Sequence, residues 1–335
     1  MRRREALTTI CLILAAASAD GGVTFVWAAS PGKQVVRLGF VRSTSPSSPF
    51  DKRNEPAFWD RLRELGWIRG ENFLVEDASA EGHIERLPSL MNAILARKVD
   101  ILVVAGTPAA IAAKNATRTI PIVDVVMGDP VGTGVVSSLA RPGSNLTGLS
   151  MGWGDDLAGK WLELLQQAIP RLSSLAVIAD PTHAMNRRQA KRVQAIAPAR
   201  GIKVRIVDAR GPETLDRAFE QAARTAQAVL VLDDPNLIAQ EERVVGLAAK
   251  HRLPDMHVQR DFVDAGGLMS YAPDYSVMFR HAAEYVDKIL RGAKPGELPI
   301  EEPTKFELVI NLRTANALGL RIPETLLLRV DEVLK

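Results

Sequence analysis

The sequence has a single cysteine, Cys11, among 335 residues. Cys11 lies in an apolar amino-terminal segment, and a chain that has lost this segment contains no cysteine at all. Disulfide bonds and thiol chemistry are then excluded. The sequence also lacks an excess of charge of one sign, because 42 basic residues face 39 acidic ones. A net charge of +3 is too balanced for a nucleic-acid-binding surface.

Catalytic signatures are missing as well. The sequence contains no Gly-x-Ser-x-Gly nucleophile turn and no phosphate-binding P-loop. A Gly-Thr-Gly-Val-Val-Ser stretch at 132–137 resembles a dinucleotide fingerprint, but Ser137 replaces its third glycine. The histidines are scattered without the spacing of metal ligands: His83, His183, His251, His257 and His281. We therefore expect a protein that is not an enzyme and that has neither a cofactor nor a metal.

The first residues have the pattern of an export signal. The basic start Met-Arg-Arg-Arg is followed by an apolar stretch over 6–19, and Val26 and Ala28 are placed as signal peptidase requires. We predict a signal peptide over 1–28 and a periplasmic protein. The alternative is that the segment stays uncleaved and anchors the chain in the membrane.

Strand and helix patterns alternate along the remainder of the chain. Short apolar runs at 35–41, 73–76, 101–105 and 120–126 are separated by amphipathic stretches, and the alternation resumes after a Pro- and Gly-rich break near 148. A length of 335 residues suits two domains of ordinary size. The pattern predicts an α/β protein with two similar blocks, each a parallel sheet covered by helices on both faces.

Four strand ends share one design, in which a capping residue and a proline follow an apolar run. These ends are the stretches 103–110, 124–132, 176–183 and 230–237, two in each block. Open α/β sheets bind ligands beyond the carboxyl ends of their strands, so two facing blocks would form one cleft. The alternative is that Asp129, Asp180 and Asp234 only cap their helices.

The chemistry of these turns suits a small zwitterion. A helix that starts at Thr107 attracts a carboxylate through its unpaired N–H groups and its dipole. A carboxylate at a strand end, such as Asp233, would hold an ammonium group. Such binding requires no catalytic residue.

Several long stretches resemble the substrate-binding proteins of ABC transporters, a family that includes tryptophan- and tyrosine-binding members. They are residues 86–150 with the Ala-Gly-Thr-Pro-Ala-Ala turn, Lys-Trp-Leu-Glu-Leu-Leu at 160–165, Val-Leu-Val-Leu-Asp-Asp-Pro at 229–235, and the closing segment 282–334. The resemblance implies a type I periplasmic-binding-protein fold, with two Rossmann-like lobes joined by three crossovers. The lobes would comprise 35–148 with 271–297, and 149–270 with 298–335. The resemblance also implies a monomer that delivers its ligand to an ABC permease in the membrane.

The resemblance places ligand contacts on the turns that face the other lobe. In this sequence these positions are Ser43, Gly106, Thr107, Asp129, Asp180, Asp233 and Tyr271. Our hypothesis assigns the ligand carboxylate to the Gly106–Thr107 turn and its ammonium to Asp233 or Asp129.

The resemblance points to an amino acid as the ligand, and an aromatic one would suit Trp153 and Tyr271, which could stack on it. Alternatively, Trp153 packs in the hinge. A second function remains open, a membrane-tethered sensory module of the same fold that passes ligand occupancy to a signalling partner. A third, a cofactor-dependent enzyme, would need nucleotide at 132–137.

Overall fold

The computed structural model describes residues 35–232 and 234–335. The predicted signal peptide, 1–28, lies outside the described residues. The first sheet is entirely parallel and has five strands in the order β2-β1-β3-β4-β5. These strands are β1 (Val36–Arg42), β2 (Phe73–Ser79), β3 (Ile101–Ala105), β4 (Ile122–Met127) and β5 (Leu146–Ser150). We call this sheet and the helices that cover it the first lobe.

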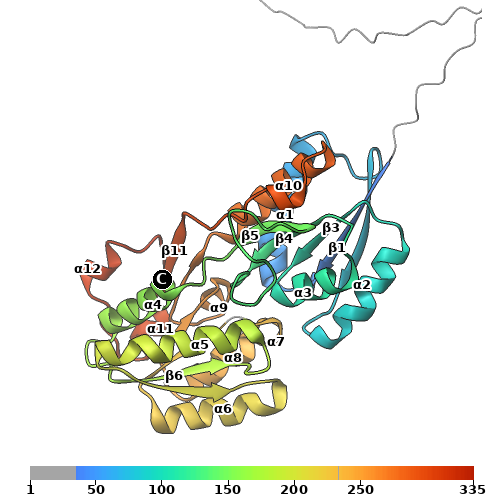
Figure 1. Cartoon of the computed structure of the whole chain (residues 1–335). Coiled ribbons are helices and arrows are strands. Elements are labelled where there is room, and N and C mark those ends of the chain that lie inside the picture. Colours follow the sequence, from blue (N-terminus) through green and yellow to red (C-terminus); the bar gives the residue numbers. More distant parts are fainter. Residues whose placement is uncertain (1–34, 233) are drawn as a thin grey trace, which may run out of the picture. The chain divides into compact units, whose positions relative to one another are not determined.

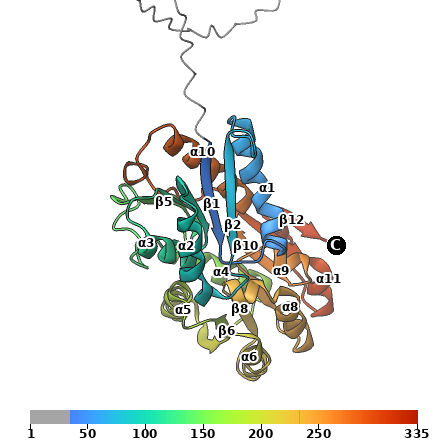
Figure 2. The same cartoon turned by 90° about the vertical axis from the view of Figure 1, so that its right-hand side faces the viewer.

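Helices cover both faces of the first sheet because its central strands carry apolar side chains on both faces. On one face Phe40 of β1 packs against Phe58 of α1, and on the other Val41 belongs to a cluster with Met91 of α2 and Ala110 of α3. Figure 1 shows α1 beside α10, and Figure 2 shows α1 and α2 on opposite sides of β1 and β2. The helices of this lobe are α1 (Pro49–Glu64), α2 (Leu87–Ala96), α3 (Thr107–Ala116), α10 (Tyr275–Leu290) and the short 3-10 helices η1 (Ile84–Arg86) and η3 (Pro295–Glu297).

The second sheet has seven strands in the order β12-β11-β10-β9-β8-β6-β7. They are β6 (Ser174–Ala179), β7 (Lys203–Asp208), β8 (Ala228–Val231), β9 (Asp255–His257), β10 (Met269–Pro273), β11 (Phe306–Asn311) and β12 (Glu332–Leu334). Its neighbours pair in parallel except for β10 and β11, which are antiparallel. The expectation of parallel sheets therefore holds for all but this pair.

Helices also cover the second sheet on both faces. Helices α4 and α5 pack together, and α6 packs with α8. The helices are α4 (Asp155–Ala168), α5 (Ala184–Ile196), η2 (Ala197–Arg200), α6 (Pro212–Thr225), α7 (Pro235–Ile238), α8 (Glu241–Lys250), α9 (Asp261–Asp264), α11 (Leu312–Ala317) and α12 (Glu324–Leu327). We call this sheet and its helices the second lobe. Within the described part of the chain, we find no helix with the length and apolarity that a membrane span requires.

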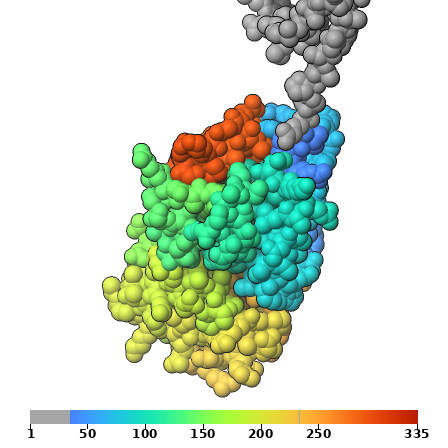
Figure 3. All heavy atoms as spheres, turned by 45° about the vertical axis from the view of Figure 1, so that its right-hand side comes forward, coloured from blue at the N-terminus to red at the C-terminus, as the bar shows by residue number. Residues whose placement is uncertain are grey.

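The chain passes between the lobes three times, after β5, after β10 and before β11. Figure 3 shows the segment of α10, in orange, lying against atoms of the first lobe. Two of the connections run side by side, because the Ser150 N–H donates to the Glu301 carbonyl and the Glu301 N–H donates to the Gly148 carbonyl. Residues 271–273, predicted in the first lobe, lie in β10 of the second sheet, since their backbone pairs with β11.

One predicted helix start is absent. The stretch after β4 continues as turns through 128–145 instead of a helix. Gly132, Gly134 and Pro142 lie in this stretch, and glycine and proline are the residues least favourable to a helix interior. The stretch 132–137 consequently lacks the helix that a dinucleotide fingerprint needs behind its glycines.

Candidate ligand-binding site

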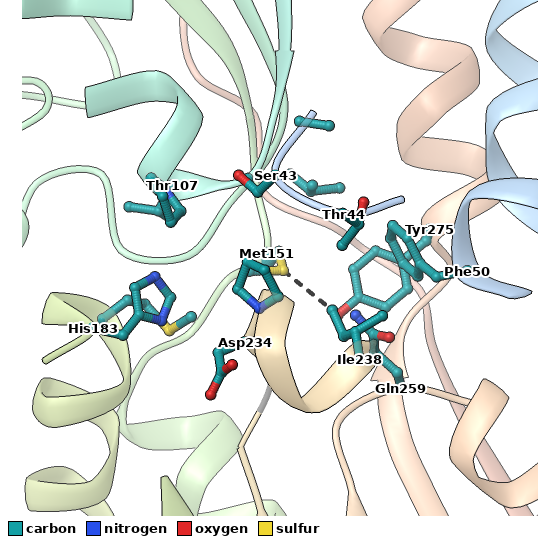
Figure 4. Close-up of a pocket in the computed structure, with 16 residues that line it drawn as sticks. Ser43, Thr44, Phe50, Thr107, Met151, His183, Asp234, Ile238, Gln259 and Tyr275 are labelled. Carbon is teal, nitrogen blue, oxygen red and sulfur yellow. Dashed lines mark hydrogen bonds between the residues drawn. The ribbon is translucent and has the colours of Figure 1, made fainter. Parts of the chain in front are cut away.

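The carboxyl ends of strands from both sheets line one cavity of about 450 Å³ of empty space, including the part open to solvent. The first lobe contributes residues 43 and 44 after β1, Phe50, residues 105–108 around the end of β3, and Val126 of β4. The second lobe contributes His183 and Met185 after β6, Asp234, Pro235 and Ile238 after β8, and Gln259 after β9. Met151 and Tyr275 come from the connections between the lobes (Figure 4).

The Gly106–Thr107 turn forms one wall of the cavity. Gly106 has φ 100, a backbone conformation that favours glycine, and it precedes α3 without a side chain to cap the helix. The Thr107 hydroxyl oxygen accepts the Gly128 N–H at 2.9 Å, which ties this turn to the end of β4. The uncapped start of a ten-residue helix therefore faces the cavity, as a carboxylate site requires.

Ser43 stands directly beside this turn. Its side chain is 1% exposed, and its hydroxyl has no hydrogen-bond partner among the described residues. A Cβ added to Gly106 would lie 3.2 Å from the Ser43 hydroxyl oxygen, so the hydroxyl almost touches the turn. The backbone holds Ser43 in place, since its N–H donates to the Ala105 carbonyl and its carbonyl accepts the Gly82 N–H.

A buried carboxyl lies beneath the turn. Asp124 of β4 is 0% exposed, and the pKa of its carboxyl is raised to about 7 because burial penalises the charged form. The N–H groups of Val126, Gly106 and Val125 lie near this carboxyl and oppose the shift, and the Val126 N–H donates to it at 2.9 Å. Asp124 thus places a carboxyl close to the backbone of the Gly106 turn.

The other end of the first-lobe wall is apolar. The Phe50 and Tyr275 rings meet edge to face with their centroids 5.0 Å apart, and Ile238 faces them from the second lobe (Figure 4). The Tyr275 hydroxyl donates to the Val258 carbonyl at 3.1 Å, which directs the ring. Phe50 is positioned by the start of α1, where Ser48 caps the helix by accepting the Asp51 N–H.

The second lobe contributes three polar residues to the cavity lining, His183, Asp234 and Gln259. His183 is 7% exposed, and burial lowers its pKa to about 4, so the imidazole is neutral at pH 7. The Asp234 carboxylate caps α7 by accepting the Asn236 and Leu237 N–H groups, and it also accepts from the Asn186 amide. Among the described residues that line the cavity there is no lysine and no arginine.

Three of the predicted site residues, Ser43, Gly106 and Thr107, lie in the cavity wall. Asp129 and Asp180 are not in the lining. The Asp129 carboxylate is ion-paired with Arg188 at 3.2 Å and Arg192 at 2.9 Å, both on α5 of the other lobe. The Asp180 carboxylate accepts the backbone N–H and the hydroxyl of Thr182 in the turn before α5, and it does not cap that helix, whose N-cap residue is His183. Asp233 lies outside the described residues, and its role stays a prediction.

The two aromatic residues singled out in the sequence also lie outside the cavity lining. The Tyr271 ring stacks on Phe306 with centroids 5.5 Å apart, because Tyr271 belongs to β10 and not to the turn that follows. Trp153 is 3% exposed and packs edge to face on Trp161, the hinge-packed alternative.

The structure adds residues that the sequence did not single out, chiefly Phe50, His183 and Tyr275. His183 had a signal, since it ends the stretch 176–183 that was recognised as a lobe-facing turn. Phe50 had none, because it follows a Ser- and Pro-rich segment of irregular pattern. Tyr275 begins α10, and only the pairing of β10 with β11 shows where that helix starts.

Comparison with known proteins places this geometry in a family. Residues 51–334 match the family model of the ABC transporter substrate binding protein. The chain is similar to the tyrosine-binding protein of Clostridioides difficile, with 25% identity over 265 residues, 79% of this chain and 76% of that protein. It is also similar to a crystal structure of a conserved domain protein from Vibrio cholerae, with 26% identity, a TM-score of 0.84, and coverage of 90% of this chain and 100% of that one. A Streptococcus pneumoniae ABC domain in complex with L-Trp has 22% identity and a TM-score of 0.83, with coverage of 89% and 99%.

Proposed function

Because the chain belongs to the ABC transporter substrate binding protein family, we propose that it is the solute-binding component of an ABC importer and that its solute is an aromatic amino acid. The observation that carries this proposal is the division of the cavity into two ends. One end has the uncapped start of α3 with the Ser43 hydroxyl, and the other has Phe50, Tyr275 and Ile238.

The polar end suits the backbone of an amino acid. The ligand carboxylate would accept hydrogen bonds from the first turn of α3 and from Ser43, and the ammonium would face the second lobe. Asp234 lines the cavity there, and Asp233 keeps its predicted role as a partner of the ammonium. A lining without lysine or arginine, among the residues described, favours a zwitterion over a ligand with net negative charge.

The apolar end suits the ligand side chain. Burial of one aromatic side chain contributes roughly 1.5–3 kcal/mol, and each charge-assisted hydrogen bond contributes about 1.5–3 kcal/mol. Three such bonds and one buried ring reach the roughly 8 kcal/mol of a micromolar complex after part is offset by ordering. The name of the tyrosine-binding relative and the L-Trp in the streptococcal structure agree with this choice of ligand.

A thermal-shift measurement tests the proposal. L-tyrosine and L-tryptophan should raise the melting temperature, because a ligand that binds the native state stabilises it. Tyramine, which lacks the carboxylate, and 3-(4-hydroxyphenyl)propionate, which lacks the amine, should leave it unchanged. If a sugar or a dicarboxylate raises the melting temperature and neither amino acid does, the proposal of an amino-acid ligand is wrong.

A serine pair gives a matched control for the same measurement. We expect Ser43→Ala to weaken L-tyrosine binding roughly five- to tenfold, the equivalent of about 1–1.5 kcal/mol for one hydrogen bond. Ser47→Ala removes an exposed hydroxyl from the same segment and should bind as the unchanged protein does. Equal affinities of the two variants in calorimetry would take Ser43 out of the site.

We also propose that the protein acts outside the cytoplasm. The support is the basic and apolar start of the chain with Val26 and Ala28 before a cleavage point. Mass spectrometry of the mature protein should give the mass of a chain that begins at Ala29. The mass of a chain that still contains residues 6–19 would point to an anchored protein instead.

A further inference from the structure

His183 has a buried polar side chain whose ring makes no hydrogen bond within the described part of the chain. Its imidazole is 7% exposed and lines the cavity at the start of α5, below Thr107 of the other lobe (Figure 4). Neither ring nitrogen has a hydrogen-bond partner among the residues that the structure describes. Buried polar groups in native proteins are nearly always paired, so an unpaired one that faces a cavity points to a ligand.

A second unpaired group faces the same cavity from the opposite side. The Ser43 hydroxyl belongs to the first lobe and His183 to the second. One ligand that hydrogen bonds to both side chains would give each of them a partner and would connect the two lobes. Two unpaired groups on facing walls suit a ligand with two polar groups, one for each lobe.

The chemistry of each side decides which ligand group it takes. The first lobe presents donors, namely the start of α3 and the Ser43 hydroxyl, and donors suit a carboxylate. His183 lies on the opposite wall, where the Asp234 carboxylate also lines the cavity. A neutral imidazole has one nitrogen with a free lone pair, and an ammonium N–H is its natural donor.

We propose that His183 is a specificity-determining residue whose neutral imidazole accepts a hydrogen bond from the ligand's amino group, so that protonation of His183 opposes ligand binding. This inference rests on the proposed function, because it takes the ligand to be an amino acid. It adds the residue that reads the amine and a dependence of affinity on pH.

The charged groups around His183 leave it neutral in the closed cavity. Burial is the largest effect and lowers the pKa of His183 to about 4; the nearby Asp180 carboxylate and Asn186 side chain favour the protonated form, and Arg187 opposes it. The Asp234 carboxylate lines the same cavity on α7. From the first lobe, Thr107 faces the ring, and Asp124 lies buried beneath the neighbouring turn with a pKa of about 7.

Opening of the cleft restores water to the ring and with it a pKa near the ordinary value of about 6.5. The closed, ligand-bound form then binds fewer protons than the open form, so binding releases a proton and weakens as the pH falls below about 6.5. With pKa values of about 6.5 and about 4, the dissociation constant should rise about tenfold between pH 7.5 and pH 5.5.

Calorimetry on the purified full chain with L-tyrosine and L-tryptophan as probes tests this inference. The unchanged protein should lose about tenfold in affinity between pH 7.5 and pH 5.5, and it should release roughly 0.7 proton per ligand at pH 6 in buffers of different ionisation enthalpy. His183→Gln keeps an acceptor that does not titrate, so it should bind with little pH dependence. His183→Ala loses the acceptor and should bind at least about fivefold more weakly at pH 7.5.

His251→Gln is the matched control, since His251 lies at the end of α8 and is not in the cavity lining. It should behave as the unchanged protein does. If the tenfold loss persists in His183→Gln, the titrating group is another one, such as Asp124, and the inference is overturned. An unweakened His183→Ala overturns it as well, while the proposed function stands. If neither amino acid binds the unchanged protein at pH 7.5, the proposed function fails and the inference falls with it.

Discussion

Asp124 shows at the scale of one residue how the site is supported from below. It occupies the middle of an otherwise apolar strand, with no exposed surface, and one of its carboxyl oxygens has no partner among the described residues. The other oxygen accepts the Val126 N–H at 2.9 Å. The one acidic residue in the apolar run 120–126 could not be assigned to the support of the site from the sequence. Strand periodicity predicts burial, but it does not predict which groups a buried side chain contacts.

The charge of Asp124 should make folding stability depend on pH. Its folded pKa of about 7 is above the ordinary value of 3.8, so the folded state holds the proton more tightly and stability falls as the pH rises through this window. We expect Asp124→Asn to gain roughly 2–3 kcal/mol of unfolding free energy relative to the unchanged protein between pH 5 and pH 8. Urea unfolding of both proteins at these two pH values measures the difference.

Other groups titrate in the same range, among them Glu241, whose pKa burial raises to about 7. They are present in both proteins and cancel in the comparison. Parallel pH profiles of the two proteins would mean that the Asp124 carboxyl is not the group that titrates.

At the scale of elements, the strand–turn–helix unit of 101–116 agrees closely with its prediction from sequence. The apolar run gives β3, and Gly-Thr-Pro marks the start of α3, because each residue has a conformational preference that suits its place. The stretch after β4 has a similar capping residue and proline but continues as turns. A capping residue and a proline therefore do not by themselves make a helix start; the residues that follow decide whether a helix forms.

Substitution of Gly106 tests how far this turn depends on glycine. Gly106→Ala must hold an L-residue at φ 100 and bring its Cβ within 3.2 Å of the Ser43 hydroxyl oxygen. We expect a loss of about 1–2 kcal/mol of stability and weaker L-tyrosine binding, since the N–H groups of the turn shift with the backbone. Urea unfolding and calorimetry measure the two effects.

Gly159 in α4 provides the matched control. An added Cβ there meets nothing within 4 Å, and its φ lies outside the left-handed region. Gly159→Ala should stabilise the protein by about 0.5–1 kcal/mol, because alanine favours a helix interior. If Gly106→Ala and Gly159→Ala stabilise the protein equally, the turn at Gly106 does not require glycine and the prediction is wrong.

At the scale of the whole described chain, 35–232 and 234–335, two sets of ion pairs connect the two lobes. Asp129 of the first lobe pairs with Arg188 and Arg192 of the second, and Arg53 of α1 pairs with Asp261 and Asp264 of α9. These pairs exist only where the lobes approach each other. Asp129 therefore joins the two lobes in this structure, whereas the sequence suggested a contact with the ligand.

Loss of the Asp129 charge should favour the open arrangement of the lobes. We expect Asp129→Asn to weaken L-tyrosine binding about fivefold, the equivalent of about 1 kcal/mol for a partly exposed ion pair, and to increase the radius of gyration with ligand below saturation. Calorimetry and small-angle X-ray scattering measure these changes. The effect should shrink at high salt, because the pairs are partly exposed to solvent.

Asp155 is the control for this prediction. It pairs with the same Arg192 at 3.2 Å, but it lies on α4 of the second lobe and does not cross the cleft. Asp155→Asn should leave affinity and radius of gyration unchanged. If Asp129→Asn behaves in the same way, the pair across the cleft contributes nothing to closure.

The sequence by itself determined the alternation of strands and helices, the largely parallel sheets and the Gly106–Thr107 turn, because these follow from local periodicity and from the conformational preferences of single residues, whereas Ser43 was predicted from the family resemblance. Only the tertiary structure decided which acidic side chains reach the cavity, since Asp129 meets arginines of α5 and Tyr271 meets Phe306 through contacts between distant segments. His183 and Phe50 enter the site for the same reason. Pairing across the cleft depends on how two separately folded sheets are placed, and no short stretch of sequence contains that information.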